Sequence, residues 1–453
     1  LTAEGIHQLR KDDLSDEQLV FLDDYMKDNV LPFLSPQIVN ARHPFPHLEN
    51  GGLYIIVRLD EQAAPKQKKT KEEKARAKAE KAERAEKAEG KQSKNLGAEG
   101  VTLGIIPLPR QTARVIELPG DGLSYMLVEH AIEMFVPEIF SMYTVKHTNI
   151  ICVTRNADLD ATEGAEEQGE DYREHMKRIL KKRSRLAPVR LESERPLSRT
   201  VKGLLLDKLG LADHQLFVTK VPLNMGYTWG LGSRLPAERR AELTQKPFTP
   251  QWPACLDKQR SVIEQVGEHE VLLSYPYQSM DAFVRLLHEA ANDPAVISIK
   301  ITLYRLASQS HLAEALIAAA ENGKEVTALF ELRARFDESN NIEWSQRFEA
   351  AGCHVIYGFR NFKVHSKICT ITRQTDEGLQ YITQLGTGNY NEKTAKLYTD
   401  FSFITTDPRI GADAADFFRN MALENTSDDY GILWVAPLMI KQNILRNIDE
   451  QIA

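Results

Sequence analysis

The sequence has few cysteines, no long apolar run and no excess of positive charge. Its 453 residues include four cysteines that are far apart and form no CxxC pair: Cys152, Cys255, Cys353 and Cys369. A disulfide framework or a zinc knuckle is therefore not expected, and the pattern fits a reducing cytoplasm. No stretch approaches the roughly 18 apolar residues that a membrane-spanning helix needs, so we expect no transmembrane segment. The 57 basic and 64 acidic residues give a net charge of −7, which disfavours a general polyanion-coating protein but allows a local basic groove.

The first residue is Leu1 rather than Met, and no basic or apolar leader segment follows it. We therefore expect a piece of a longer protein that begins upstream. At roughly 150 residues per domain, the length suggests about three domains.

The N-terminal part predicts a helix at 16–26, where apolar residues recur at spacings of three and four, and paired strands at 53–59 and 101–108. Between the strands, residues 66–94 are almost wholly Lys, Arg, Glu and Ala. This composition forms helix readily but offers no apolar face, so we expect a solvated helical arm. A nucleic-acid-binding arm is the alternative, but the segment lacks aromatic residues for stacking, and we expect no nucleic-acid partner.

Further elements follow, and glycine and proline then become frequent between residues 226 and 253, which places a domain boundary near residue 250. The elements expected before this boundary are helices at 126–135, 166–183 and 204–211 and strands at 149–153, 188–192 and 217–221.

After residue 250, strands alternate with helices. Strands are expected at 271–275, 296–304, 326–332, 354–357, 364–372, 379–385 and 399–405, and helices at 280–292, 312–322, 342–351 and 411–421. This alternation predicts an α/β domain with a mostly parallel sheet, preceded by an α+β domain. Functional residues should then gather at one sheet edge, beyond the strand ends.

His365 and Lys367 lie two residues apart in one expected strand, so their side chains should share a face. A nearby ammonium lowers the pKa of an imidazole and keeps it nucleophilic, and it offsets the charge of an arriving phosphoryl group. The alternative is a surface strand that carries two polar residues by chance.

Arg305 and Arg335 follow neighbouring expected strands, and guanidinium groups bind phosphate oxygens in pairs. Each arginine also has an ordinary structural interpretation. Arg305 can be a capping residue, and Arg335 can form an ion pair with Asp337 and Glu338. Residues 386–389 can turn backbone N–H groups toward an anion or form an ordinary tight turn. The residues of this loop are Gly386, Thr387, Gly388 and Asn389. Tyr398 follows, either exposed and able to stack on a base or buried.

Four segments together resemble the family of bacterial polyphosphate kinases. They are ITLYR at 301–305, ELRARFDE at 331–338, FKVHSK at 362–367 and LGTGNYNEKTAKLYTDFS at 385–402. The resemblance implies reversible transfer of the ATP γ-phosphate to inorganic polyphosphate through a phosphohistidine. It also implies a head domain over 1–250 that carries the insert and forms a homo-oligomer, a first phospholipase D-like catalytic domain over 251–432, and the start of a second over 433–453.

The resemblance assigns roles residue by residue. His365 matches the phosphorylated nucleophile, beside Lys367, and Tyr398 matches a nucleotide-contacting tyrosine. Arg305 and Arg335 match the arginines of the magnesium–phosphate site. Because an arginine has no lone pair to offer a metal, we expect both to hold phosphate oxygens that bind Mg²⁺. ATP, ADP and polyphosphate are the expected partners, and the expected location is cytoplasmic, with peripheral membrane attachment left open.

Two departures from the family matter. The family's N-terminal domain and most of its second catalytic domain have no counterpart in this sequence, so we expect the chain by itself to be a poor catalyst. Position 372 is Thr, where the phospholipase D motif HxKxxxxD has an aspartate. A phospholipase D-like phosphodiesterase and an inactive polyanion-binding or oligomerisation module are the rival interpretations.

Overall fold

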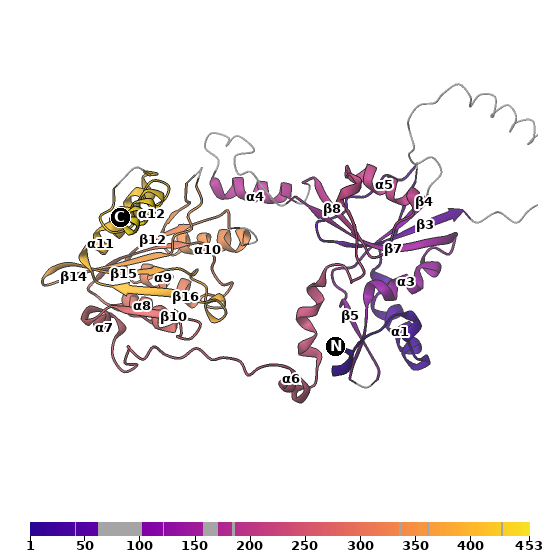
Figure 1. Ribbon diagram of the computed structural model, residues 1–453, viewed down its shortest axis with the longest axis horizontal. Helices are drawn as coiled ribbons and strands as arrows, with labels where there is room; N and C mark the ends of the chain where they lie inside the picture. Colours follow the sequence, from indigo (N-terminus) through magenta and orange to yellow (C-terminus); the bar gives the residue numbers. More distant parts are fainter. Residues whose placement is uncertain are drawn as a thin grey trace, which may run out of the picture. The chain divides into compact units, whose positions relative to one another are not determined.

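The computed structural model describes residues 1–40, 42–61, 102–120, 122–156, 171–183, 186–334, 337–359, 362–426 and 429–453. The chain divides into two compact units, which Figure 1 shows in sequence colours. Unit 1 comprises Leu1–Asp158 and Leu180–Lys246, and unit 2 comprises Leu159–Ile179 and Pro247–Ala453. The predicted arm at 66–94 and Arg335 lie outside the described residues.

Unit 1 contains a three-stranded sheet in the order β1-β6-β5 and a six-stranded sheet in the order β2-β4-β3-β7-β8-β9. Its strands are β1 (Ile6–Gln8), β2 (Gln37–Val39), β3 (Leu53–Glu61), β4 (Thr102–Pro107), β5 (Val115–Leu118), β6 (Leu123–Leu127), β7 (Tyr143–Arg155), β8 (Pro188–Ser193) and β9 (Leu216–Val218). Its helices are α1 (Asp16–Asn29), α3 (Val128–Ile139), α5 (Arg199–Leu209) and α6 (Ala237–Leu243), and α4 (Tyr172–Arg183) spans both units.

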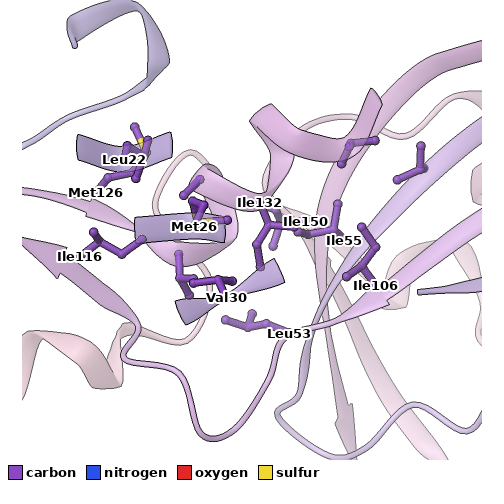
Figure 2. Close-up of a cluster of buried hydrophobic side chains, with 14 of the residues drawn as sticks. Leu22, Met26, Val30, Leu53, Ile55, Ile106, Ile116, Met126, Ile132 and Ile150 are labelled. Carbon is purple, nitrogen blue, oxygen red and sulfur yellow. The ribbon is translucent and has the colours of Figure 1, made fainter. Parts of the chain in front are cut away.

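The central strand β3 is buried on both faces, and its side chains alternate between two cores. Leu53 and Ile55 pack with α1 and α3 in the cluster drawn in Figure 2, whereas Tyr54 and Ile56 pack with residues of α5. The predicted pairing of 53–59 with 101–108 is confirmed, since β3 pairs antiparallel with β4. The predicted start of α1 is also correct: the Ser15 hydroxyl accepts a bond from Gln18 N, and Gln18 Oε1 accepts one from Ser15 N, which closes a capping box.

Unit 2 contains a seven-stranded sheet in the order β10-β16-β15-β14-β11-β12-β13. Its strands are β10 (Val271–Tyr275), β11 (Val296–Leu303), β12 (Glu325–Phe330), β13 (His354–Ile356), β14 (Ile368–Thr375), β15 (Gly378–Gly386) and β16 (Asp400–Thr405). Its helices are α7 (Val262–Glu268), α8 (Asp281–Asn292), α9 (His311–Glu321), α10 (Glu338–Ala350), α11 (Pro408–Ala422) and α12 (Met439–Ile452). Helix α11 packs on β14 and β15, and α9 packs on β12.

The α/β class is confirmed, but the prediction of a mostly parallel sheet is wrong. Only β11, β12 and β13 pair in parallel, whereas every pairing of β10, β14, β15 and β16 is antiparallel. The reason lies in the connections. Only residues 376–377 separate β14 from β15, and so short a link allows only a hairpin.

The pairing still gives five strands one common direction, because two reversals separate β15 from β11 and four separate β10 from β11. Only β14 and β16 run the opposite way. One edge of the sheet therefore collects the carboxyl ends of β11, β12 and β15 together with the amino ends of β14 and β16.

Candidate active site

The predicted site residues of unit 2 lie at this edge of the sheet. Arg305 follows β11, His365 and Lys367 precede β14, and residues 386–389 follow β15. The meeting of strand ends was predicted, but the local structure of His365 and Lys367 was not.

His365 and Lys367 do not lie in a strand, because β14 begins at Ile368. Before Ile368, the side chain of Thr302 in β11 takes the place of backbone hydrogen bonds between the two strands. Its hydroxyl donates to Ser366 O at 2.8 Å and accepts from Ile368 N at 3.2 Å. As a result, the two residues do not share one exposed face. His365 is exposed, whereas Lys367 is only 7% exposed.

The His365 ring lies edge-on to Tyr304, with ring centroids 4.6 Å apart and planes at 81°. Partial burial lowers the pKa of His365, and the positive charges of Lys367 and Arg305 lower it further. The imidazole is therefore held in its neutral, nucleophilic form at neutral pH.

Lys367 is an ammonium held in a nearly water-free position. Its Nζ lies 5.3 Å from the centroid of the Tyr304 ring and donates to the carbonyl oxygen of His365. Burial lowers the pKa of Lys367 to about 8, although the carboxylate of Asp400 opposes the shift. A phosphate arriving here would meet a cation that is poorly solvated and therefore interacts strongly.

Arg305 is anchored by Asp337, whose Oδ2 lies 2.8 Å from the guanidinium Nε. Its side chain remains 40% exposed, and its guanidinium carbon lies 5.8 Å from the centroid of Tyr304. Tyr304 thus lies within reach of all three cationic or titratable groups: His365, Lys367 and Arg305. An ion pair of Arg335 with Asp337 and Glu338 was one of two interpretations of the sequence, and Arg335 lies outside the described residues.

The loop at 386–389 is held against the start of β16. Thr387 Oγ1 donates to Asp400 Oδ1 at 2.8 Å and accepts from Phe401 N at 2.9 Å. The N–H groups of Gly386 and Thr387 donate to Lys367 O and Phe401 O, so these two are committed to protein partners. Gly388 is required by space, because a Cβ there would lie 2.4 Å from Asp400 Oδ2. The backbone N–H groups of the loop that are not committed in this way are those of Gly388 and Asn389.

Tyr398 is 63% exposed and lies two residues before the start of β16. Its exposure leaves the ring available for stacking, which was one of the two readings of the sequence.

Several residues that shape the site were missed by reasoning on sequence. Glu331, 2% exposed, accepts from Val364 N at 2.8 Å and from Arg333 N at 2.9 Å, and so fixes the backbone before His365. Tyr304, Glu331, Asp337 and Asp400 all lie within the segments quoted above, but only their contacts reveal their roles. No signal in the local sequence assigns Asp400 to Lys367.

A cavity of about 530 Å³ opens beside His365 and Lys367. Its other walls are largely apolar and include Phe362, Tyr430 and Trp434. The described residues contain no group of three or more His, Cys, Asp and Glu side chains that could hold a metal ion.

Comparison with known families matches residues 17–231 to the polyphosphate kinase middle domain and residues 261–427 to the polyphosphate kinase C-terminal domain 1. The chain belongs to the polyphosphate kinase family. A polyphosphate kinase from Bacillus cereus is 36% identical over the whole chain, and one from Lactiplantibacillus plantarum is 32% identical over the whole chain. The chain spans 60% and 58% of these relatives.

The fold agrees with this membership. The crystal structure of polyphosphate kinase from Porphyromonas gingivalis aligns with all of this chain, with a TM-score of 0.75 and 24% sequence identity. The alignment covers 61% of the Porphyromonas gingivalis chain. The chain is thus similar in fold to part of a polyphosphate kinase. Within the described ranges, no helix combines the length and apolar character needed to cross a bilayer.

Proposed function

We propose that this chain carries the phosphohistidine site of an ATP:polyphosphate phosphotransferase. A neutral His365 beside the cations of Lys367 and Arg305 supports the proposal most directly. This arrangement suits nucleophilic attack on a phosphoryl group, because the nucleophile is uncharged while its surroundings are positive.

In the proposed reaction, a ring nitrogen of His365 forms a bond to the γ-phosphorus of ATP as the bond to the β,γ-bridging oxygen breaks. ADP leaves with that electron pair. A terminal oxygen of polyphosphate then attacks the phosphohistidine, the N–P bond breaks and the polymer grows by one phosphate. Positioning and charge neutralisation supply most of the rate in such transfers.

The surrounding residues have proposed roles in holding the substrates. Lys367 and Arg305 bind oxygens of the transferred phosphoryl group, and Asp337 orients Arg305 for this task. Arg335 is proposed to join them on the strength of the family resemblance alone. The loop at 386–389 contacts phosphate, and Tyr398 stacks on the base of the nucleotide.

Magnesium fits this site only as part of the substrate. Arginines cannot ligate a metal, and the described carboxylates near His365 already act on cations. Asp337 pairs with Arg305, Glu331 pairs with Arg333, and the charge of Asp400 raises the pKa of Lys367. We therefore propose that Mg²⁺ arrives bound to ATP oxygens, while Arg305 and Arg335 hold the same phosphates. Mg²⁺ would supply further neutralisation of phosphate charge.

Cytoplasmic location and assembly into a homo-oligomer through unit 1 are also proposed. The four free cysteines fit a reducing compartment. Neither point affects the chemistry at His365.

The test uses ATP labelled in the γ-phosphate and the full-length protein. The proposal expects an acid-labile, alkali-stable label on His365 and its transfer to polyphosphate. The His365→Ala variant should take up no label, and the His365→Gln variant should not recover it, because an amide is not a competent nucleophile for phosphorus. Hydrolysis of a phosphodiester without labelling by ATP would instead support the phospholipase D-like rival. Polymer synthesis at the wild-type rate by the alanine variant would disprove the role of His365.

A further inference from the structure

A basic cavity lies in unit 1, where β7 ends, β8 begins and α5 ends. Its volume is about 490 Å³, within the range of small-molecule sites. Three basic residues, Arg155, His47 and Lys208, line it together with apolar residues that include Phe45, Pro188 and Leu209.

Arg155 gives this cavity an unusual charge. It is the last residue of β7 and is only 8% exposed. Its Nε donates to Leu48 O at 2.7 Å, one terminal nitrogen donates to Leu186 O at 2.8 Å, and the other lies 3.4 Å from His47 Nδ1. These partners are neutral, and burial lowers the pKa of Arg155. The partners hold the guanidinium in place but do not neutralise it.

Another well-covered arginine of unit 1 has an anionic partner. Arg114, whose side chain is 17% exposed, pairs with the buried carboxylate of Glu129 at 2.7 Å. Among the residues that the structure describes, no carboxylate forms an ion pair with Arg155 or Lys208. A buried cation without an anion is costly, and a bound anion would remove that cost.

Lys208 adds a second cation to the cavity. Its exposed ammonium extends from the last turn of α5. A guanidinium can only donate, so His47 Nδ1 accepts from Arg155 and helps to fix its position. Arg155 and Lys208 together suit an anion with several oxygens in a row.

We propose that this cavity binds a segment of inorganic polyphosphate. Several linked phosphates match a cavity of this size with two cations in its wall better than a single phosphate does. The choice of polyphosphate over other oligophosphates rests on the proposed function, whereas the binding of an oligophosphate rests on the cavity alone. The site would hold the polymer on unit 1, on residues other than those proposed to transfer phosphate.

The test is lysine footprinting of the full chain with an amine-acetylating reagent, read by mass spectrometry. The probes are tripolyphosphate, ATP and orthophosphate, each titrated separately. Tripolyphosphate should slow the acetylation of Lys208 several-fold at a lower concentration than ATP or orthophosphate. Lys11, an exposed lysine of unit 1 that does not line the cavity, is the matched control and should be unaffected.

Two variants make the result specific. Arg155→Lys keeps the charge but not the planar fork, and it should raise the half-protecting concentration of tripolyphosphate about 10-fold, the loss typical of one charge-assisted hydrogen bond. Because this buried residue also holds Leu48 and Leu186, a folding defect is a risk. Lys208→Gln avoids a folding defect because Lys208 is exposed, and it should lower the calorimetric affinity for tripolyphosphate about 10-fold. Lys11→Gln should leave that affinity unchanged.

The His365→Ala chain separates this inference from the proposed function. Protection of Lys208 in that chain should equal the wild-type protection, even if phosphotransfer is lost. Equal acetylation of Lys208 with and without tripolyphosphate, or equal protection of Lys11, would overturn the site. Protection by ATP at concentrations equal to or below those of tripolyphosphate would overturn the assignment to polyphosphate.

Discussion

Replacing Lys367 by methionine should stabilise unit 2 while it damages the proposed chemistry. Lys367 is almost fully buried, and its pKa is lowered to about 8. At pH 7 the free energy of unfolding is therefore about 3 kcal/mol lower than it would be if Lys367 kept the ordinary lysine pKa of about 10.4. Methionine is unbranched, apolar and of similar length, so it can fill the same space.

The expected gain is smaller than this figure, because methionine also loses the hydrogen bond to the His365 carbonyl oxygen. Such a bond contributes about 1 kcal/mol, which leaves a net stabilisation of about 2 kcal/mol at pH 7. For a unit of this size, that corresponds to a rise in Tm of about 4–8 °C.

The pH dependence provides a sharper check. Below about pH 8 Lys367 is protonated in both the folded and the unfolded wild-type chain, so the full cost of burying its charge lowers stability. Between about pH 8 and 10.4 only the unfolded state retains the proton, so wild-type stability rises with pH relative to the variant. The advantage of Lys367→Met should therefore shrink across this window.

Calorimetric unfolding of the two chains at several pH values measures the effect. Lys363→Met is the matched control, because Lys363 lies in the same loop but is exposed, and it should change stability by less than about 0.5 kcal/mol. A Lys367→Met chain that is no more stable than wild type at pH 7, or whose advantage is the same at pH 10, would refute the reasoning. The same variant should form phosphohistidine about 10²–10³-fold more slowly.

The remaining predictions concern the site itself. The rate of ATP-dependent labelling of His365 should not decline as pH falls to about 6.5, the ordinary pKa of histidine, because its surroundings lower the pKa of His365. A decline that begins above pH 6.5 would contradict this. Arg305→Lys should lose most phosphotransfer while its Tm stays near wild type, because lysine cannot reproduce the planar fork; wild-type turnover would make Arg305 a structural residue. Gly388→Ala should lower Tm and activity together, since the new Cβ would collide with Asp400. Gly267→Ala is the control and should not lower Tm, because open space surrounds Gly267. Equal behaviour of the two variants would show that the loop moves to accommodate the methyl group.

The fold of unit 2 was only partly predictable from sequence. The positions of its strands follow from apolar runs and were largely correct, but the direction of pairing was not. A strand has the same local pattern in parallel and antiparallel pairs, so direction depends on the connections. The two-residue link at 376–377 was the one local clue that β14 and β15 form a hairpin.

The sequence by itself determined which residues could carry the chemistry. His365, Lys367 and Arg305 were identified from their types and their spacing relative to strand ends, and the quoted segments indicated the family. These properties are local, because they depend on residue identity and on distances along the chain.

Only the tertiary structure decided how those residues are placed. It buries Lys367 and exposes His365, pairs Arg305 with Asp337, and brings Asp400 against Gly388. It also leaves Arg155 of unit 1 buried beside neutral partners. Burial and pairing depend on contacts between residues far apart in the sequence, so the pKa values and charges that define both sites exist only once the chain has folded.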